Sequence, residues 1–146
     1  MFLNELNSKE AVAFINLVNQ FANIDEVFAK EEKELIESYL EELNIGPDKV
    51  NLLKYEEIID ELKKSTNRVK SILYFELVGL ALVDGDYGDK EIDFLDKIAI
   101  GLDIKRSKKI AFANYFFNFK EIYDFSVVDA DSKIQLLKEE AELLLA

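Results

Sequence analysis

The sequence predicts an all-α fold, a compact bundle of about seven helices forming a single domain over residues 1–146. Apolar residues recur at spacings of three and four, the period of one face of an α-helix, in one segment after another. No segment alternates apolar and polar residues for long enough to predict a strand. The single proline and five glycines leave room for long uninterrupted helices.

The first helix is expected to begin after Asn7 and to run to about Asn23. Asn7 suits an N-cap, and Glu10 lies three residues later, as in a capping box. Its apolar face comprises Ala11, Phe14, Ile15, Val18, Phe21 and Ala22. After an acidic turn over residues 25–28, a second helix is expected from about Lys30 to Leu43.

Pro47 suits the first turn of a helix, which predicts a third helical region over about residues 48–64 with a break near Lys54. Ser65, Thr66 and Asn67 can cap a fourth helix that continues to about Val83. Its apolar residues cover most of the circumference, which is typical of a central, buried helix.

Three more helices follow an acidic loop at residues 84–91. The fifth is expected to end near Gly101, the sixth to span about Arg106–Tyr123, and the last to span Ser132–Leu145 after a connector. Each carries an apolar face with helical spacing.

Adding 59 to positions in the first third of the chain often leads to a similar residue, which indicates either an internal repeat or a coincidence of amphipathic phase. Apolar positions match in phase, as expected for two similarly packed helical units, and the acidic loops match as well. The matched pairs include Phe14 with Leu73, Val18 with Leu77, Ala22 with Ala81, Asp25 with Asp84, Phe28 with Tyr87, Glu32 with Glu91, and Ile45 with Ile104. We therefore predict two helix–acidic loop–helix units with an approximate twofold relation.

The composition excludes several classes of site. The formal net charge of −12 argues against a nucleic-acid partner, which needs a cationic surface. The absence of histidine and cysteine excludes thiolate or imidazole metal sites and Ser-His-Asp triads, so a bound metal would be a hard cation such as Ca²⁺ or Mg²⁺ on oxygen ligands. No apolar run approaches the roughly 18–20 residues that cross a bilayer, and we expect a cytoplasmic protein without membrane insertion.

Two interpretations fit the acidic loops. In the first, Gly85 ends one helix, Gly88 caps the next, and Glu91 completes a capping box, which needs no ligand. In the second, a divalent cation binds to carboxylates of one or both loops. The candidate ligands are Asp84, Asp86, Glu91, Asp25 and Glu32. The spacing does not fit an EF-hand, because Leu95 stands at its twelfth position.

The second acidic loop and its flanks resemble the TerB-like family, which includes tellurite-resistance proteins and a co-chaperone domain. The matching residues are Ala81, Asp84, Gly85 and Glu91, followed by the apolar stretch from Phe94 to Ala99. Ala22, Asp25 and Glu32 match the first-half counterpart, although Glu26 stands in place of the glycine. The resemblance implies a bundle of about seven helices, a role in stress response or metal resistance, and cation binding by acidic residues.

Two further clusters are candidates for an interaction surface. The sixth helix is rich in aromatic residues, and one face cannot hide them all. Tyr115 and Phe117 then face a second side, which is either also buried or a partner surface. Lys105, Arg106, Lys108 and Lys109 open the same helix, where positive charge opposes the helix dipole. They form either a solvated helix end or a docking site for an acidic surface.

Together these features predict a non-enzymatic, stress-related adaptor or cation-responsive interaction domain that binds a protein partner or forms a homo-oligomer. One alternative is a hydrolase that uses a carboxylate-bound divalent metal. Another is a purely structural assembly component.

Overall fold

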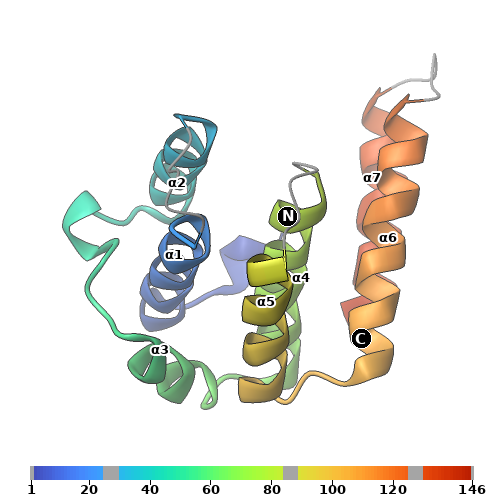
Figure 1. Cartoon of the computed structure of the whole chain (residues 1–146). Coiled ribbons are helices and arrows are strands. Elements are labelled where there is room, and N and C mark those ends of the chain that lie inside the picture. The colour runs from blue at the N-terminus through green and yellow to red at the C-terminus, as the bar shows by residue number, and fades with distance from the viewer. Residues whose placement is uncertain (1, 25–29, 84–88, 125–129, 146) are drawn as a thin grey trace.

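The computed structural model describes residues 2–24, 30–83, 89–124 and 130–145 (Figure 1). Within these ranges only the backbone is described at residues 30–33, 35, 82–83, 117–124 and 130–137. The described part of the chain contains seven α-helices and two short 3₁₀-helices and no strand, so the predicted all-α fold is confirmed. The elements are η1 (Leu3–Glu5), α1 (Ser8–Ala22), α2 (Lys30–Leu43), η2 (Pro47–Lys49), α3 (Tyr55–Leu62), α4 (Asn67–Val83), α5 (Asp89–Gly101), α6 (Arg106–Asp124) and α7 (Ala130–Leu145).

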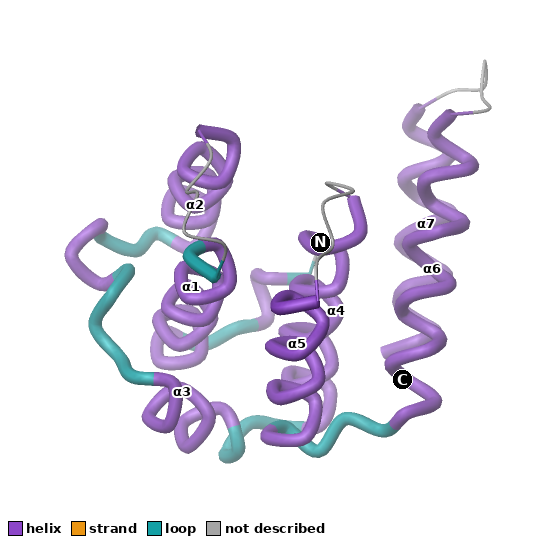
Figure 2. The backbone as a smooth tube through the Cα atoms, viewed as in Figure 1, coloured by secondary structure: helices purple, strands orange, loops and turns teal. Residues whose placement is uncertain are grey.

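The helices are arranged as three pairs that stand side by side: α1 with α2, α4 with α5, and α6 with α7 (Figure 1). The short helix α3 lies across the end of the first pair and packs mainly against α1, and α6 packs mainly against α4. Helix α4 is buried at every residue from Ser71 to Gly79 except Glu76, as predicted for the central helix. Figure 2 shows a long loop between η2 and α3, and shorter loops before α4 and α6.

Local conformation repeats at the predicted interval of 59 residues. Asn7 caps α1, and its Oδ1 accepts a hydrogen bond from the Glu10 amide at 2.8 Å; Thr66 occupies the corresponding position before α4, where its Oγ1 accepts from the Val69 amide at 3.2 Å. Both second helices of the repeat end on a non-glycine residue in the left-handed region, Asn44 (φ 55°) and Asp103 (φ 58°).

The hydrogen bonds that close these two helix ends also correspond. The Ile45 amide donates to the Leu40 carbonyl at 2.9 Å, and the Ile104 amide donates to the Ala99 carbonyl at 2.8 Å. The helices of the two pairs therefore begin at corresponding residues, and their second helices close with corresponding hydrogen bonds, which supports the predicted duplication. The twofold relation between them stays a prediction.

The third predicted helical region, over about residues 48–64 with a break near Lys54, has this break, but the break is wider than expected. The chain forms η2, a non-helical segment at residues 50–54, and then α3. The reason is the buried side chain of Asn16, which bonds the backbone of this segment from the neighbouring helix α1.

Aromatic packing joins α4 to α6. The Phe75 ring lies at the centre, with ring centroids at 5.2 Å from Phe112, 5.1 Å from Tyr115 and 4.7 Å from Phe116. Gly79 lets the two helices approach, because a Cβ there would lie 2.7 Å from Cζ of Phe116. The glycine in the middle of α4 therefore serves packing, at the cost of helix propensity.

Arg68 ties both ends of the chain to α4. Its guanidinium forms a two-pronged ion pair with Glu5 of η1 at 2.8 and 2.9 Å. A second pair, at 2.8 Å, joins Arg68 to Glu142 of α7. The guanidinium also lies 5.8 Å from the centroid of the Phe2 ring. Hydrogen bonding to Arg68 lowers the pKa of Glu5 below its ordinary value of 4.5.

Replacing Gly79 by alanine is expected to destabilise the protein by about 1–3 kcal/mol, despite the better helix propensity of alanine, because the new methyl group would displace the packed Phe116 ring. Gly101→Ala is the matched control, since its Cβ would lie 3.2 Å from Ile59 Cγ2 and needs only a small adjustment. Urea unfolding measures both variants. Adding Phe116→Leu to Gly79→Ala should recover part of the loss; equal stability of the two alanine variants would contradict the packing role.

Glu5 makes the attachment of η1 sensitive to acid. Its pKa is lowered in the folded state, so its contribution is fully present above pH 4.5 and is lost as pH falls through the folded-state pKa. Wild type should therefore lose melting temperature more steeply than Glu5→Gln as pH falls below about 4.5. Glu37→Gln, an exposed α2 position without an ion pair among the described residues, should follow wild type. Parallel acid profiles for wild type and Glu5→Gln would contradict the assignment.

Candidate functional site

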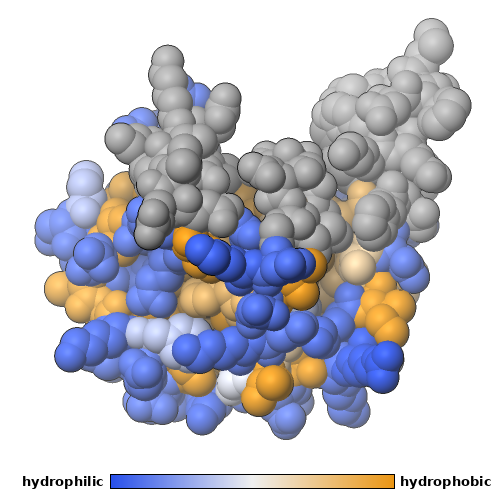
Figure 3. Space-filling model, viewed as in Figure 1, coloured by the Kyte–Doolittle hydropathy of each residue, from blue (hydrophilic) through white to orange (hydrophobic). Residues whose placement is uncertain are grey.

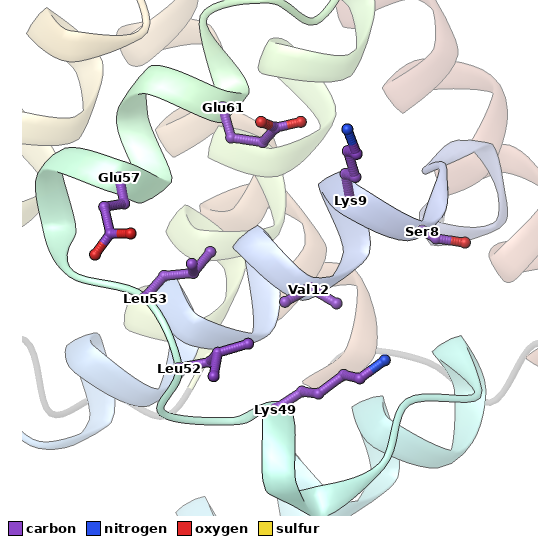
Figure 4. Close-up of a pocket in the computed structure, with 8 residues that line it drawn as sticks. All are labelled: Ser8, Lys9, Val12, Lys49, Leu52, Leu53, Glu57 and Glu61. Carbon is purple, nitrogen blue, oxygen red and sulfur yellow. The ribbon is translucent and has the colours of Figure 1, made fainter.

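A groove of about 440 Å³ lies between the first half of α1, the segment that follows η2, and α3 (Figure 4). Its floor and walls combine three aliphatic side chains with four charged ones and one hydroxyl. The lining residues are Ser8, Lys9, Val12, Lys49, Leu52, Leu53, Glu57 and Glu61.

The non-helical wall of this groove is held by Asn16, which is only 1% exposed. Its Nδ2 donates to the carbonyls of Val12 and Lys49, each at 2.8 Å. Its Oδ1 accepts from the amides of Leu52 and Leu53 at 2.7 and 2.8 Å. Both amide hydrogens and both oxygen lone pairs are thereby used, so the side chain fixes the segment in one position.

Two more contacts complete this support. The Gln20 side chain donates to the Leu53 carbonyl at 3.2 Å. Glu10, which closes the capping box of α1, also accepts a hydrogen bond from the Ser65 hydroxyl in the link between α3 and α4. The two helices that flank the groove are thus tied together at both ends.

Leu52 is held at the surface by this arrangement, with 61% of its surface exposed. Among the described residues, the other large apolar side chains that are exposed are Ile100, Ile110 and Leu143, and none of them lines the groove. Figure 3 shows a face on which hydrophilic side chains predominate and apolar ones gather in separate groups. Leu52 lines the groove together with Val12 and Leu53, which are only partly buried, and apolar side chains gathered in one place are typical of a binding surface.

Charge is divided across the groove. Glu57 and Glu61 project from α3 on one side, while Lys9 and Lys49 lie on the other (Figure 4). Glu57 accepts a hydrogen bond from the Lys54 amide at 3.2 Å, and Glu61 lies 3.5 Å from the Lys64 ammonium. No ion pair of Lys9 or Lys49 occurs among the described residues. The site can therefore bind an apolar group while attracting cations along one edge and anions along the other.

The predicted cation ligands fall mostly beyond what the structure describes. Asp25, Asp84 and Asp86 lie outside the described residues, and Glu32 lies in α2 with only its backbone described. Glu91 is buried in the first turn of α5, with 6% of its surface exposed. The described ranges contain no group of three or more acidic side chains placed to hold a metal ion. Cation binding by the two loops stays a prediction.

Tyr115 is not part of an exposed interaction surface, which corrects that interpretation. It is 3% exposed and packs against Phe75 and Phe116. Burial, with a smaller effect of the Glu140 and Glu76 carboxylates, raises the pKa of Tyr115 to about 12. Tyr115 therefore lies on the face of α6 that packs against α4, as Phe112 and Phe116 do, and is buried there. For Phe117 only the backbone is described.

The basic cluster at the start of α6 is divided between solvent and structural contacts. Lys105 and Arg106 are exposed. The Lys108 ammonium donates to the Ser71 hydroxyl at 3.0 Å, and the Lys109 ammonium pairs with Asp96 at 2.8 Å. Two of the four cationic side chains therefore bind α6 to α4 and α5. The four do not form a joint docking site.

Sequence reasoning missed the groove. The available signals were a polar residue, Asn16, within the otherwise apolar run from Ala13 to Val18, and the expected break near Lys54. Neither identifies the other as its partner, because residues 16 and 52 meet only through tertiary packing.

No protein-family model, curated protein or solved structure matches this chain. Of the helices described, none combines the length and apolar character needed to span a bilayer.

Asn16→Ala is expected to destabilise the protein by about 2–4 kcal/mol, because the amides of Leu52 and Leu53 and the carbonyl of Lys49 would lose their partner. Asn23→Ala is the matched control: its side chain makes the same bond to the carbonyl four residues earlier, at 2.7 Å, but it is exposed. Urea unfolding compares the two, and hydrogen exchange should show faster exchange at Leu52 and Leu53 in Asn16→Ala alone. Equal losses in both variants would contradict this role of Asn16.

Proposed function

We propose that the protein is a non-enzymatic interaction module, an adaptor that binds a segment of a partner protein in the groove between α1 and α3. The observation that supports this proposal is the exposed Leu52, held in place beside an open groove by a fully bonded, buried asparagine.

The physical reason is preorganisation. A loop that orders only on binding loses conformational entropy at that step, which weakens the complex. Here the backbone of Leu52 and Leu53 is already fixed by Asn16 and Gln20. The aliphatic floor can therefore be buried by a partner without reorganising the domain.

The resemblance to the TerB-like family implies a role in stress response or metal resistance, and a cytoplasmic adaptor is compatible with that role. In that setting, cation binding at the acidic loops around Asp25 and Asp84 would be a separate, regulatory property. The net charge of −12 favours a protein partner over a nucleic acid. The rival hydrolase would need inward carboxylates converging on an open site, whereas Glu57 and Glu61 lie at the edge of the groove.

Selection of a random-peptide display library on the immobilised protein tests this proposal. Peptides should be enriched on wild type, and Leu52→Glu should lower their affinity at least tenfold, because the change places a carboxylate where the apolar contact is made. Ile100→Glu is the matched control, since Ile100 is 82% exposed and lies outside the groove. Enrichment that is unaffected by Leu52→Glu, or equally affected by Ile100→Glu, would overturn the proposal.

A further inference from the structure

We propose that the groove takes an amphipathic α-helix of a partner protein, with basic side chains along one flank and acidic side chains along the other. This inference rests on the proposed function and adds the class of partner. It follows from the bonding of the groove backbone, from the residues absent from its lining, from its charges, and from the second repeat of the chain.

An added strand would find several backbone groups of the non-helical wall already bonded. The amides of Leu52 and Leu53 and the carbonyl of Lys49 are bonded to Asn16, and the Leu53 carbonyl accepts from Gln20. The other walls are sides of helices, whose backbone groups are bonded internally beyond the first turn. This lining favours an occupant that satisfies its own backbone groups, as a helix does.

The lining also lacks the side chains of other recognition modes. Grooves for proline-rich segments are lined by aromatic rings, and phosphate-reading sites use clustered arginines. The eight lining residues include neither. An aliphatic floor of Val12, Leu52 and Leu53 is instead suited to aliphatic side chains at helical spacing.

The second repeat shows a helix beside the equivalent position. Lys9 corresponds to Arg68, 59 residues later, and Arg68 pairs with Glu142 of α7. Helix α7 packs against both α4 and α6, with Ala141 and Leu145 buried. In the first repeat no described helix packs at the position that corresponds to α7. Lys9 has no ion pair among the described residues.

Charge distinguishes the proposed occupant from α7 of a second copy. The exposed positions of α7 include Glu139, Glu140 and Glu142, whose charges would face Glu57 and Glu61 unfavourably. A matching helix carries carboxylates toward Lys9 and Lys49 and cations toward the α3 glutamates. Since Glu57 and Glu61 are four residues apart on one helix, partner cations with the same spacing can meet both.

Three synthetic helical peptides of about 18 residues test the inference, all with leucines at positions i, i+4 and i+7. One has lysines on one flank and glutamates on the other, one has glutamates on both, and one has lysines on both. Exchanging the flanks would be no control, because turning the helix end to end restores the match. Fluorescence anisotropy at about 0.15 M and 0.5 M salt separates groove binding from general attraction to the acidic protein.

The mixed peptide should bind wild type about tenfold more tightly than either single-charge peptide, and Leu52→Glu and Leu52→Ser should weaken it at least tenfold, with Ile100→Glu unchanged. In the double variant Lys9→Glu, Lys49→Glu the preference should pass to the all-lysine peptide. Thermal melts verify that each variant is folded. A proline in the middle of the mixed peptide should cost at least tenfold in affinity, since it breaks the helix.

Equal binding of all three peptides, no change of preference in the double variant, or no effect of the proline would overturn the helical, mixed-charge partner. Leu52-dependent binding of extended library peptides would overturn it too, while leaving the proposed function intact. If no peptide from either source depends on Leu52, the proposed function itself fails. Self-association in sedimentation that Leu52→Glu abolishes would replace the foreign helix by a second copy of this chain.

Discussion

The groove and the segment that forms its wall depend on the side chain of Asn16. A carboxamide inside a helical bundle is costly unless its donors and acceptors are all used, and here they are. Two of its bonds reach residues 36 and 37 positions away in the chain. The side chain therefore supplies the hydrogen bonds that allow a non-helical segment to lie against a helical core. The exposure of Leu52 follows from this fixed backbone.

Much of the fold could be predicted from the sequence, because its signals are local. The capping box of Asn7 and Glu10 forms as expected, and the start of α2 at Lys30 and the end of α4 at Val83 agree with the apolar pattern. Residues 59 positions apart also share backbone conformation at the ends of their helices. Asn44 and Asp103 adopt the same left-handed conformation at the ends of their helices, although neither is a glycine.

The errors lie where tertiary contacts decide the outcome. Residues 50–54 have apolar spacing compatible with a helix, yet bonding to Asn16 holds them out of one. Tyr115 looks like a residue on a second face of its helix, but the face against α4 is wide enough to include it beside Phe112 and Phe116. The candidate site could not be predicted at all, because its lining comes from three segments of which none carries a motif.

In the predicted duplication, two residues beside the groove of the first repeat correspond to residues of a packed core in the second. Asn16 corresponds to Phe75, and Leu53, whose amide Asn16 binds, corresponds to Phe112, whose ring packs on Phe75 with centroids 5.2 Å apart. At equivalent positions of the two repeats, a side chain–backbone hydrogen bond thus joins Asn16 to Leu53, and an apolar contact joins Phe75 to Phe112. A hydrogen-bonding side chain needs backbone groups that are not already bonded within a helix, which favours a non-helical segment. An aromatic ring needs apolar side chains, which a continuous helix supplies. The following segment is accordingly a loop and a short α3 in the first repeat and the long helix α6 in the second. The polar residue Asn16 thus accompanies a groove beside a non-helical segment, and the aromatic residue at the equivalent position, Phe75, accompanies a packed core between two long helices.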